Sequence, residues 1–219
     1  MHTFSLDRTD FLNTATHAVG FLLSIIGLPI LVHAALDRGG KAHLISSVVF
    51  GVCMVAMFAT STIYHASAPS KIRCVRRRYR RRFRMADHIA IYLMIAGSYT
   101  PYCVTVLKHT VGWPLLTALW AMVAFGAVYK LFFLGRFPRV SLVLYLCMGC
   151  TSIFVMGPLL EKLPPISFHL LMAGGTAFLI GTGFFVYESR RPSYHVVWHI
   201  FVLIGSACLY GSILGGIPA

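Results

Sequence analysis

The sequence predicts an all-α membrane protein, a bundle of seven transmembrane helices. Of its 219 residues, 58% are apolar and only 11% are charged, whereas globular chains carry about 25% charged residues. The apolar residues also gather into seven blocks. Each block has about the 20 residues that a helix needs to cross the hydrocarbon core of a bilayer. The composition and the blocks together indicate an integral, multi-pass membrane protein.

The seven apolar blocks follow one another with short links between them. We expect helices over residues 17–36, 44–65, 88–107, 113–134, 140–160, 167–187 and 195–215. The links leave no room for a separate soluble domain, so residues 1–219 are expected to form one domain. The N-terminal segment, MHTFSLDRTD, lacks the basic region and cleavage site of a signal peptide. The first apolar block is therefore expected to be a transmembrane helix of the mature protein rather than a signal peptide that is cleaved.

The Lys and Arg residues outside the helices predict which side of the membrane each link faces. Fifteen of the 19 Lys and Arg residues lie in the N-terminal segment and in or beside the second, fourth and sixth links, with Lys130, near the end of the fourth block, counted among them. Segments rich in Lys and Arg face the cytoplasm. The N-terminus is therefore expected in the cytoplasm and the C-terminus outside, which is the parity that seven helices give.

The second link holds nine of these basic residues, in the run KIRCVRRRYRRRFR over residues 71–84. Such runs also occur in nuclear-localisation and nucleic-acid-binding segments. Between two membrane helices, the run is better explained as a topology anchor that contacts anionic lipid headgroups. We therefore expect membrane lipids as partners and no nucleic acid. The sequence does not set the oligomeric state.

Two histidines, His195 and His199, are four residues apart at the start of the seventh block. On a helix both imidazoles project from one face, one turn apart. His65 ends the second block and Asp87 precedes the third, so the expected topology brings all four residues to one depth near the cytoplasmic side. Ionisable groups at membrane depth are costly, and their default interpretation is functional.

These residues predict a metal site. Three neutral imidazoles can form a zinc site with one open position, so we predict that His65, His195 and His199 bind Zn²⁺. Zinc lowers the pKa of a water molecule in that position to about 7. Asp87 is predicted to orient the water or accept its proton. Ser61, one turn before His65, is predicted to hydrogen bond within the site or to stabilise an oxyanion.

The alternative interpretation is that these are interfacial histidines without a metal, beside a serine that packs between helices. His17, with Asp10 and Asn13, could form a network at the start of the first helix, where Asn13 or Thr14 would be the N-cap. His88 could simply lie at the interface, and no role is assigned to it.

Four motifs resemble those of the hemolysin III family, part of the progestin and adipoQ receptor superfamily that includes the adiponectin receptors. The family patterns ExxNxxTH, SxxYH, DH followed by IYxxIAGxYTP, and HxxWH correspond to DFLNTATH (10–17), STIYH (61–65), DHIAIYLMIAGSYTP (87–101) and HVVWH (195–199). The resemblance covers nearly the whole chain. The chain departs from it at Asp10, where the family usually has Glu, and its arginine run is heavier than the family's.

The resemblance implies a seven-helix fold with the N-terminus inside the cell. It also implies a zinc ion bound by the histidines that match His65, His195 and His199, with the Ser61 and Asp87 positions nearby. Relatives are regarded as metal-dependent hydrolases, and the adiponectin receptors are associated with hydrolysis of the ceramide amide bond.

Three functions are compatible with these features. The first is an intramembrane zinc hydrolase that cleaves a lipid amide or ester, with the lipid entering from the cytoplasmic leaflet. The second is a receptor or signalling protein in which zinc only ties two helices together, although the short links offer little docking surface. The third is a pore or lytic protein, which should carry polar residues along a face across the whole bilayer. Here the ionisable residues gather at one end, and we favour the hydrolase.

Overall fold

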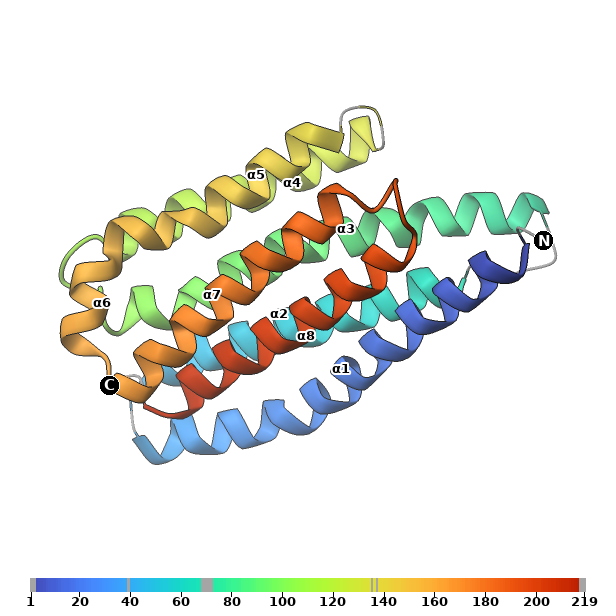
Figure 1. The fold of residues 1–219 in the computed structure, drawn as a ribbon. Coiled ribbons are helices and arrows are strands. Elements are labelled where there is room, and N and C mark those ends of the chain that lie inside the picture. Colours follow the sequence, from blue (N-terminus) through green and yellow to red (C-terminus); the bar gives the residue numbers. More distant parts are fainter. Residues whose placement is uncertain (1–2, 39, 68–72, 135, 137, 217–219) are drawn as a thin grey trace.

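The computed structural model describes residues 3–38, 40–67, 73–134, 136 and 138–216, and all regular elements in these residues are helices. The all-α prediction is therefore confirmed. The helices are α1 (Thr3–Arg38), α2 (Lys41–Ala66), α3 (Arg73–Val104), α4 (Gly112–Phe133), α5 (Pro138–Cys150), the 3-10 helix η1 (Thr151–Val155), α6 (Met156–Lys162), α7 (Pro165–Val186) and α8 (Ser193–Leu214). Because α5, η1 and α6 continue one another, the described residues form seven helical rods (Figure 1).

The rods lie side by side, and the start of α1 and the end of α8 lie at opposite ends of the bundle (Figure 1). Helix α2 packs between α1 and α3, and α3 also contacts α4 and α5. Helix α7 packs mainly on α8, which closes the bundle against α1. Large buried side chains such as Phe50 and Phe58 on α2 and Tyr92 on α3 fill the centre. The end of α2 and the start of α8 are thereby brought to the same end of the bundle.

Six of the rods are long and apolar enough to cross a membrane: α1 from Arg8, α2, α4, the rod over Arg139–Lys162, α7 and α8. Large apolar side chains point outward from them, as in Leu22 (60% exposed), Phe132 (74%) and Phe154 (88%). Extensive exposed apolar surface marks contact with a membrane or another protein. The chain is an integral, multi-pass membrane protein.

Helix α3 is not apolar enough to count as a membrane span by composition. Six of the seven expected membrane spans are therefore found among the described residues. Helix α3 begins at Arg73 rather than at residue 88, because most of the basic run continues the helix instead of forming a loop. Arginine is a good helix former, and no Gly or Pro interrupts the run. Residues 71–72 and the side chains of residues 73–78 lie outside the described part of the chain.

Helix α1 begins at Thr3 rather than at residue 17. Asn13 and Thr14 are therefore inside the helix, and the prediction that one of them is its N-cap is wrong. Thr14 Oγ1 instead donates a hydrogen bond to the carbonyl of Asp10, one turn earlier, at 2.8 Å. This longer α1 carries Asp10 and Asn13 alongside the ends of α2 and α8, where both contact histidines.

The fifth rod is interrupted, although a continuous helix was expected over residues 140–160. Pro158 has no N–H to donate, and its ring clashes with the carbonyl four residues earlier in an α-helix. The chain accordingly tightens into η1 at Thr151–Val155. Tyr99 of α3 satisfies the freed backbone groups: its hydroxyl donates to the Gly149 carbonyl at 2.6 Å and accepts from the Ser152 N–H at 2.9 Å.

Candidate metal centre

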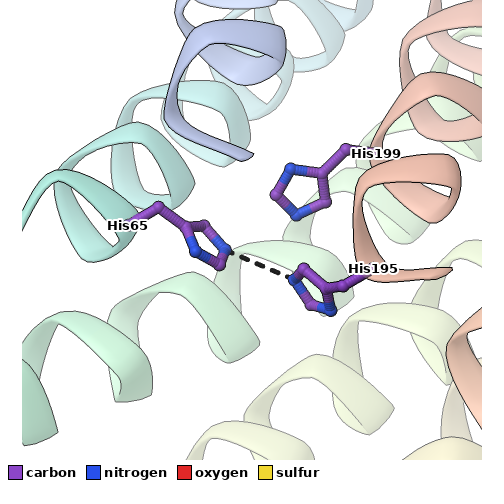
Figure 2. Close-up of side chains that lie close together, drawn as sticks. All are labelled: His65, His195 and His199. Carbon is purple, nitrogen blue, oxygen red and sulfur yellow. Dashed lines mark hydrogen bonds between the residues drawn. The ribbon is translucent and has the colours of Figure 1, made fainter. Parts of the chain in front are cut away.

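Three imidazoles from two distant helices meet at one end of the bundle. His65 lies in the last turn of α2, and His195 and His199 lie one turn apart at the start of α8 (Figure 2). One ring nitrogen from each lies within 4.8 Å of the others. The Nε2 atoms of His65 and His195 are 3.3 Å apart. This buried cluster could hold a metal ion.

The outward-facing nitrogens of two of these rings contact oxygen acceptors. His195 Nδ1 is paired with a carboxylate oxygen of Glu188, in the turn after α7. His199 Nδ1 lies 3.2 Å from the backbone carbonyl of Asn13. An acceptor at Nδ1 fixes the proton there and leaves Nε2 with its lone pair free. Metal-ligating histidines characteristically make such contacts through the nitrogen that does not bind the metal.

The third histidine, His65, faces a carboxylate across a longer gap. Its Nδ1 atom lies 3.6 Å from Asp10 Oδ1, and Asp10 Oδ2 lies 3.9 Å from Arg80 of α3. A gap of 3.6 Å is too long for a hydrogen bond but close enough for electrostatic attraction. Asp10 therefore links the basic run of α3 to the histidine cluster.

A fourth histidine, His17 of α1, packs against this cluster. Its ring stacks on that of His199, with 3.6 Å between centroids and 16° between planes. Its side chain is only 4% exposed, and among the described residues neither ring nitrogen has a hydrogen-bond partner. His17 supports the cluster by stacking, and its ring is not one of the three whose nitrogens converge.

Ser61 and Asp87 line the same cavity as the three histidines. Ser61 is one turn before His65 on α2 and is buried. It lies close enough to Asp87 on α3 to interact with the Asp87 carboxylate. The structure thus places both predicted catalytic residues beside the predicted ligands. Their roles stay predictions.

The cavity has a volume of about 660 Å³. This value lies within the usual range for small-molecule binding pockets, about 300–1,000 Å³. Its polar end holds the histidine cluster, Ser61 and Asp87, and most of the remaining lining is apolar. The apolar walls come from α3, the α5–α6 rod, α7 and α8 and include Met94, Leu146, Phe178 and Val202. Its volume and lining suit a molecule with a polar group and an apolar chain.

The sequence analysis missed two of the groups that orient the histidines. Glu188 lies seven residues before His195 in a short link, and nothing in that spacing indicates a contact. Asn13 acts through its backbone carbonyl, which its side chain does not reveal. Asp10 was predicted to belong to a network with Asn13 and His17 and was noted as a departure from the family pattern, but its contact with His65 was not predicted. A search for acidic residues in links on the His195 side would have found Glu188.

A family model described as haemolysin-III related matches residues 7–210. The chain belongs to this family. Hemolysin-3 of Bacillus cereus is 36% identical over 207 residues, which cover 94% of this chain and 91% of that protein. The Hemolysin-3 homolog of Bacillus subtilis (strain 168) is also 36% identical, with 94% of this chain and 93% of the relative covered.

More distant relatives of this haemolysin-III family protein occur in mammals. The human monocyte to macrophage differentiation factor is 27% identical over 201 residues, which cover 92% of this chain and 81% of the human protein. No solved structure matches the chain. The resemblance seen in the motifs around Asp10, Ser61, Asp87 and His195 is thus confirmed at the level of the family.

Proposed function

We propose that this protein is a zinc-dependent hydrolase of lipid amides or esters. One observation carries the proposal: three converging histidine nitrogens share a cavity with Ser61 and Asp87. A structural metal site needs no open apolar space beside it, whereas a catalytic site for lipids needs both an open position and room for an acyl chain. The cavity of about 660 Å³ supplies that room.

The spacing of two of the three histidines fits zinc. Two nitrogens held at about 2.0–2.1 Å by one tetrahedral Zn²⁺ ion would lie roughly 3.4 Å apart. The Nε2 atoms of His65 and His195 are 3.3 Å apart. The three donors are imidazoles, which suit zinc and other transition metals better than Ca²⁺ or Mg²⁺. We therefore assign His65, His195 and His199 as ligands of Zn²⁺.

The residues around the cluster would divide the work of hydrolysis. When bound, zinc supplies Lewis-acid chemistry and makes water acidic enough to attack near neutral pH. The carboxylate of Asp87 is placed to take the proton of the attacking water. The Ser61 hydroxyl has a single proton to donate. In the complex with substrate it would donate this proton to the carbonyl oxygen of the scissile bond. The apolar walls hold the acyl chain and keep bulk water away.

We also propose that α3 is a seventh membrane crossing and that the N-terminus faces the cytoplasm. The distribution of Lys and Arg supports this orientation. The start of α1 and the end of α8 lie at opposite ends of the bundle, which supports an odd number of crossings (Figure 1). The hydrolytic site then lies toward the cytoplasmic leaflet, from which the lipid would enter. The basic start of α3 would contact anionic headgroups.

Purified protein offered a panel of acyl sphingosines, acylglycerols and phospholipids would test the proposed activity. We expect zinc-loaded protein to release fatty acid from at least one amide or ester lipid. A chelator should stop the release, and added zinc should restore it. Asp37→Asn is the matched control, because Asp37 is exposed and lies at the other end of α1. The absence of release from every lipid by zinc-loaded protein would contradict the proposal.

A further inference from the structure

Helix α4 carries a lysine within its otherwise apolar span. Lys130 is 3% exposed, and it is the one Lys, Arg, Asp or Glu among the described residues that is buried. A lysine near a helix end usually extends its ammonium group into the headgroup region. The burial of Lys130 shows that its side chain turns inward instead. A buried ammonium group is costly unless an acceptor or an opposite charge compensates it.

The protein compensates this charge only in part. Lys130 Nζ lies 3.0 Å from His88 Nδ1, and an ammonium group can only donate, so the neutral ring of His88 accepts. Tyr145 holds His88 in turn, through a hydrogen bond from its hydroxyl to the His88 carbonyl at 2.8 Å. None of the ion pairs formed within the described residues includes Lys130. An ammonium group has three N–H donors, so it can bind a further acceptor.

Lys130 lines the same cavity as the histidine cluster. His88 and Asp87 lie beside it in the cavity wall, and Asp87 interacts with it electrostatically. Beyond this polar end the wall is apolar, with Leu142, Leu146 and Met94 among its residues. A ligand that fills the cavity would therefore place an apolar chain along this wall and a polar group near Lys130. An anionic polar group would supply the charge that Lys130 lacks.

We propose that Lys130 binds the carboxylate of a long-chain fatty acid whose chain occupies the cavity. The choice of a carboxylate rests on the proposed function, since hydrolysis of a lipid amide or ester leaves a carboxylate at this end of the cavity. His88 positions the ammonium group, and the carboxylate accepts from one of its remaining N–H bonds. Lys130 is thus a binding residue for the acyl product, separate from the histidine ligands.

Equilibrium binding of three probes to the purified protein tests the assignment: oleate, methyl oleate and oleoyl lysophosphatidate. Oleate should bind more tightly than its uncharged methyl ester. Lys130→Met should weaken oleate binding about 10-fold or more, which is the loss expected for a hydrogen bond between charged groups. Methyl oleate should bind both proteins equally, which also shows that the variant is folded. Lys130→Arg should retain most of the preference for oleate.

The titrations are repeated on zinc-free protein, because a carboxylate can also bind a metal. A preference for oleate that survives zinc removal and disappears in Lys130→Met supports the proposal. A preference that disappears with zinc and survives in Lys130→Met overturns it and leaves the hydrolase proposal untouched. Equal loss of oleate and methyl oleate binding in a folded Lys130→Gln protein, the third variant, would likewise overturn it.

Two further outcomes distinguish the carboxylate site from a phosphate site and from the hydrolase proposal. Tighter binding of lysophosphatidate than of oleate, with the same dependence on Lys130, would overturn the choice of a carboxylate in favour of a phosphate. A Lys130-dependent preference for oleate in a protein that neither binds zinc nor hydrolyses lipids would support the anion site and contradict the hydrolase alone.

Discussion

The Nε2 atoms of His65 and His195 face each other at 3.3 Å, although the two residues are 130 positions apart in the chain. Such a contact requires either a proton on one of the two nitrogens, which makes it a hydrogen bond, or a cation that both nitrogens bind. His195 Nδ1 contacts the Glu188 carboxylate, which acts as an acceptor and keeps the proton of the neutral ring away from Nε2. These three histidines could hold a cation between them, and the predictions that follow test the proposed metal site and the packing that positions it.

Glu188→Gln should weaken zinc binding. The carboxylate orients the His195 ring and raises its basicity, and loss of such a partner typically costs about 10- to 100-fold in metal affinity. Competition with a chromophoric chelator measures the affinity. Glu161→Gln is the matched control, because Glu161 is exposed on α6 at the other end of the bundle and should leave zinc binding unchanged. Equal affinity in the wild type and Glu188→Gln would show that the carboxylate does not support the site.

His17→Phe should keep the metal. Phenylalanine preserves a flat ring to stack on His199 but has no nitrogen to bind an ion, and the His17 ring stacks at 3.6 Å rather than pointing a nitrogen into the cluster. Elemental analysis should find the wild-type zinc content in this variant. Loss of zinc from a folded His17→Phe protein would show that His17 is a fourth ligand.

Asp87→Asn should separate metal binding from turnover. The amide keeps the size of the side chain and its contact with Ser61 but cannot accept a proton as a carboxylate does. Removal of a general base typically lowers the rate about 10²- to 10⁴-fold. Zinc content and fatty-acid release are measured on the same sample, and zinc should be retained. Zinc loss in step with activity would instead assign Asp87 a structural role or a place among the ligands.

Gly97→Ala should destabilise the contact between α2 and α3, which positions His65 relative to Asp87. A Cβ atom at Gly97 would lie 2.8 Å from Cys53 Cβ and 2.9 Å from its sulfur, closer than packed atoms tolerate. Such overpacking costs about 1–3 kcal/mol. Thermal unfolding in detergent should show a lower midpoint than that of the wild type. Gly183→Ala, where an added Cβ meets no atom within 4 Å, should leave the midpoint unchanged or raise it.

The helix-rich fold and the residues of the cluster could be predicted because both depend on simple periodicities. The length of the apolar blocks gave the number of rods, and alternation of their direction placed the end at His65 beside the start at His195. The four-residue spacing to His199 gave the shared face. These inferences need only the bilayer thickness and the helix repeat, so no tertiary detail was required.

The helix ends and the residues that orient the histidines depend on tertiary contacts, which no local pattern encodes. The polar start of α1 and the arginine run of α3 were predicted to lie outside the helices, yet both are helical. The break at η1 depends on Pro158 together with the Tyr99 hydroxyl from another helix. Glu188 and the Asn13 carbonyl reach the histidines only because α7 and α1 flank α8.

Zinc content tests the central claim most directly. The wild type and a variant with His65, His195 and His199 all changed to Ala are purified in detergent, and the zinc per chain is measured by elemental analysis. We expect about one zinc ion per folded wild-type chain and none in the variant, the stoichiometry of a three-histidine site. A well-folded wild type that binds no zinc, even after zinc is supplied, would contradict the metal centre and the hydrolysis that depends on it.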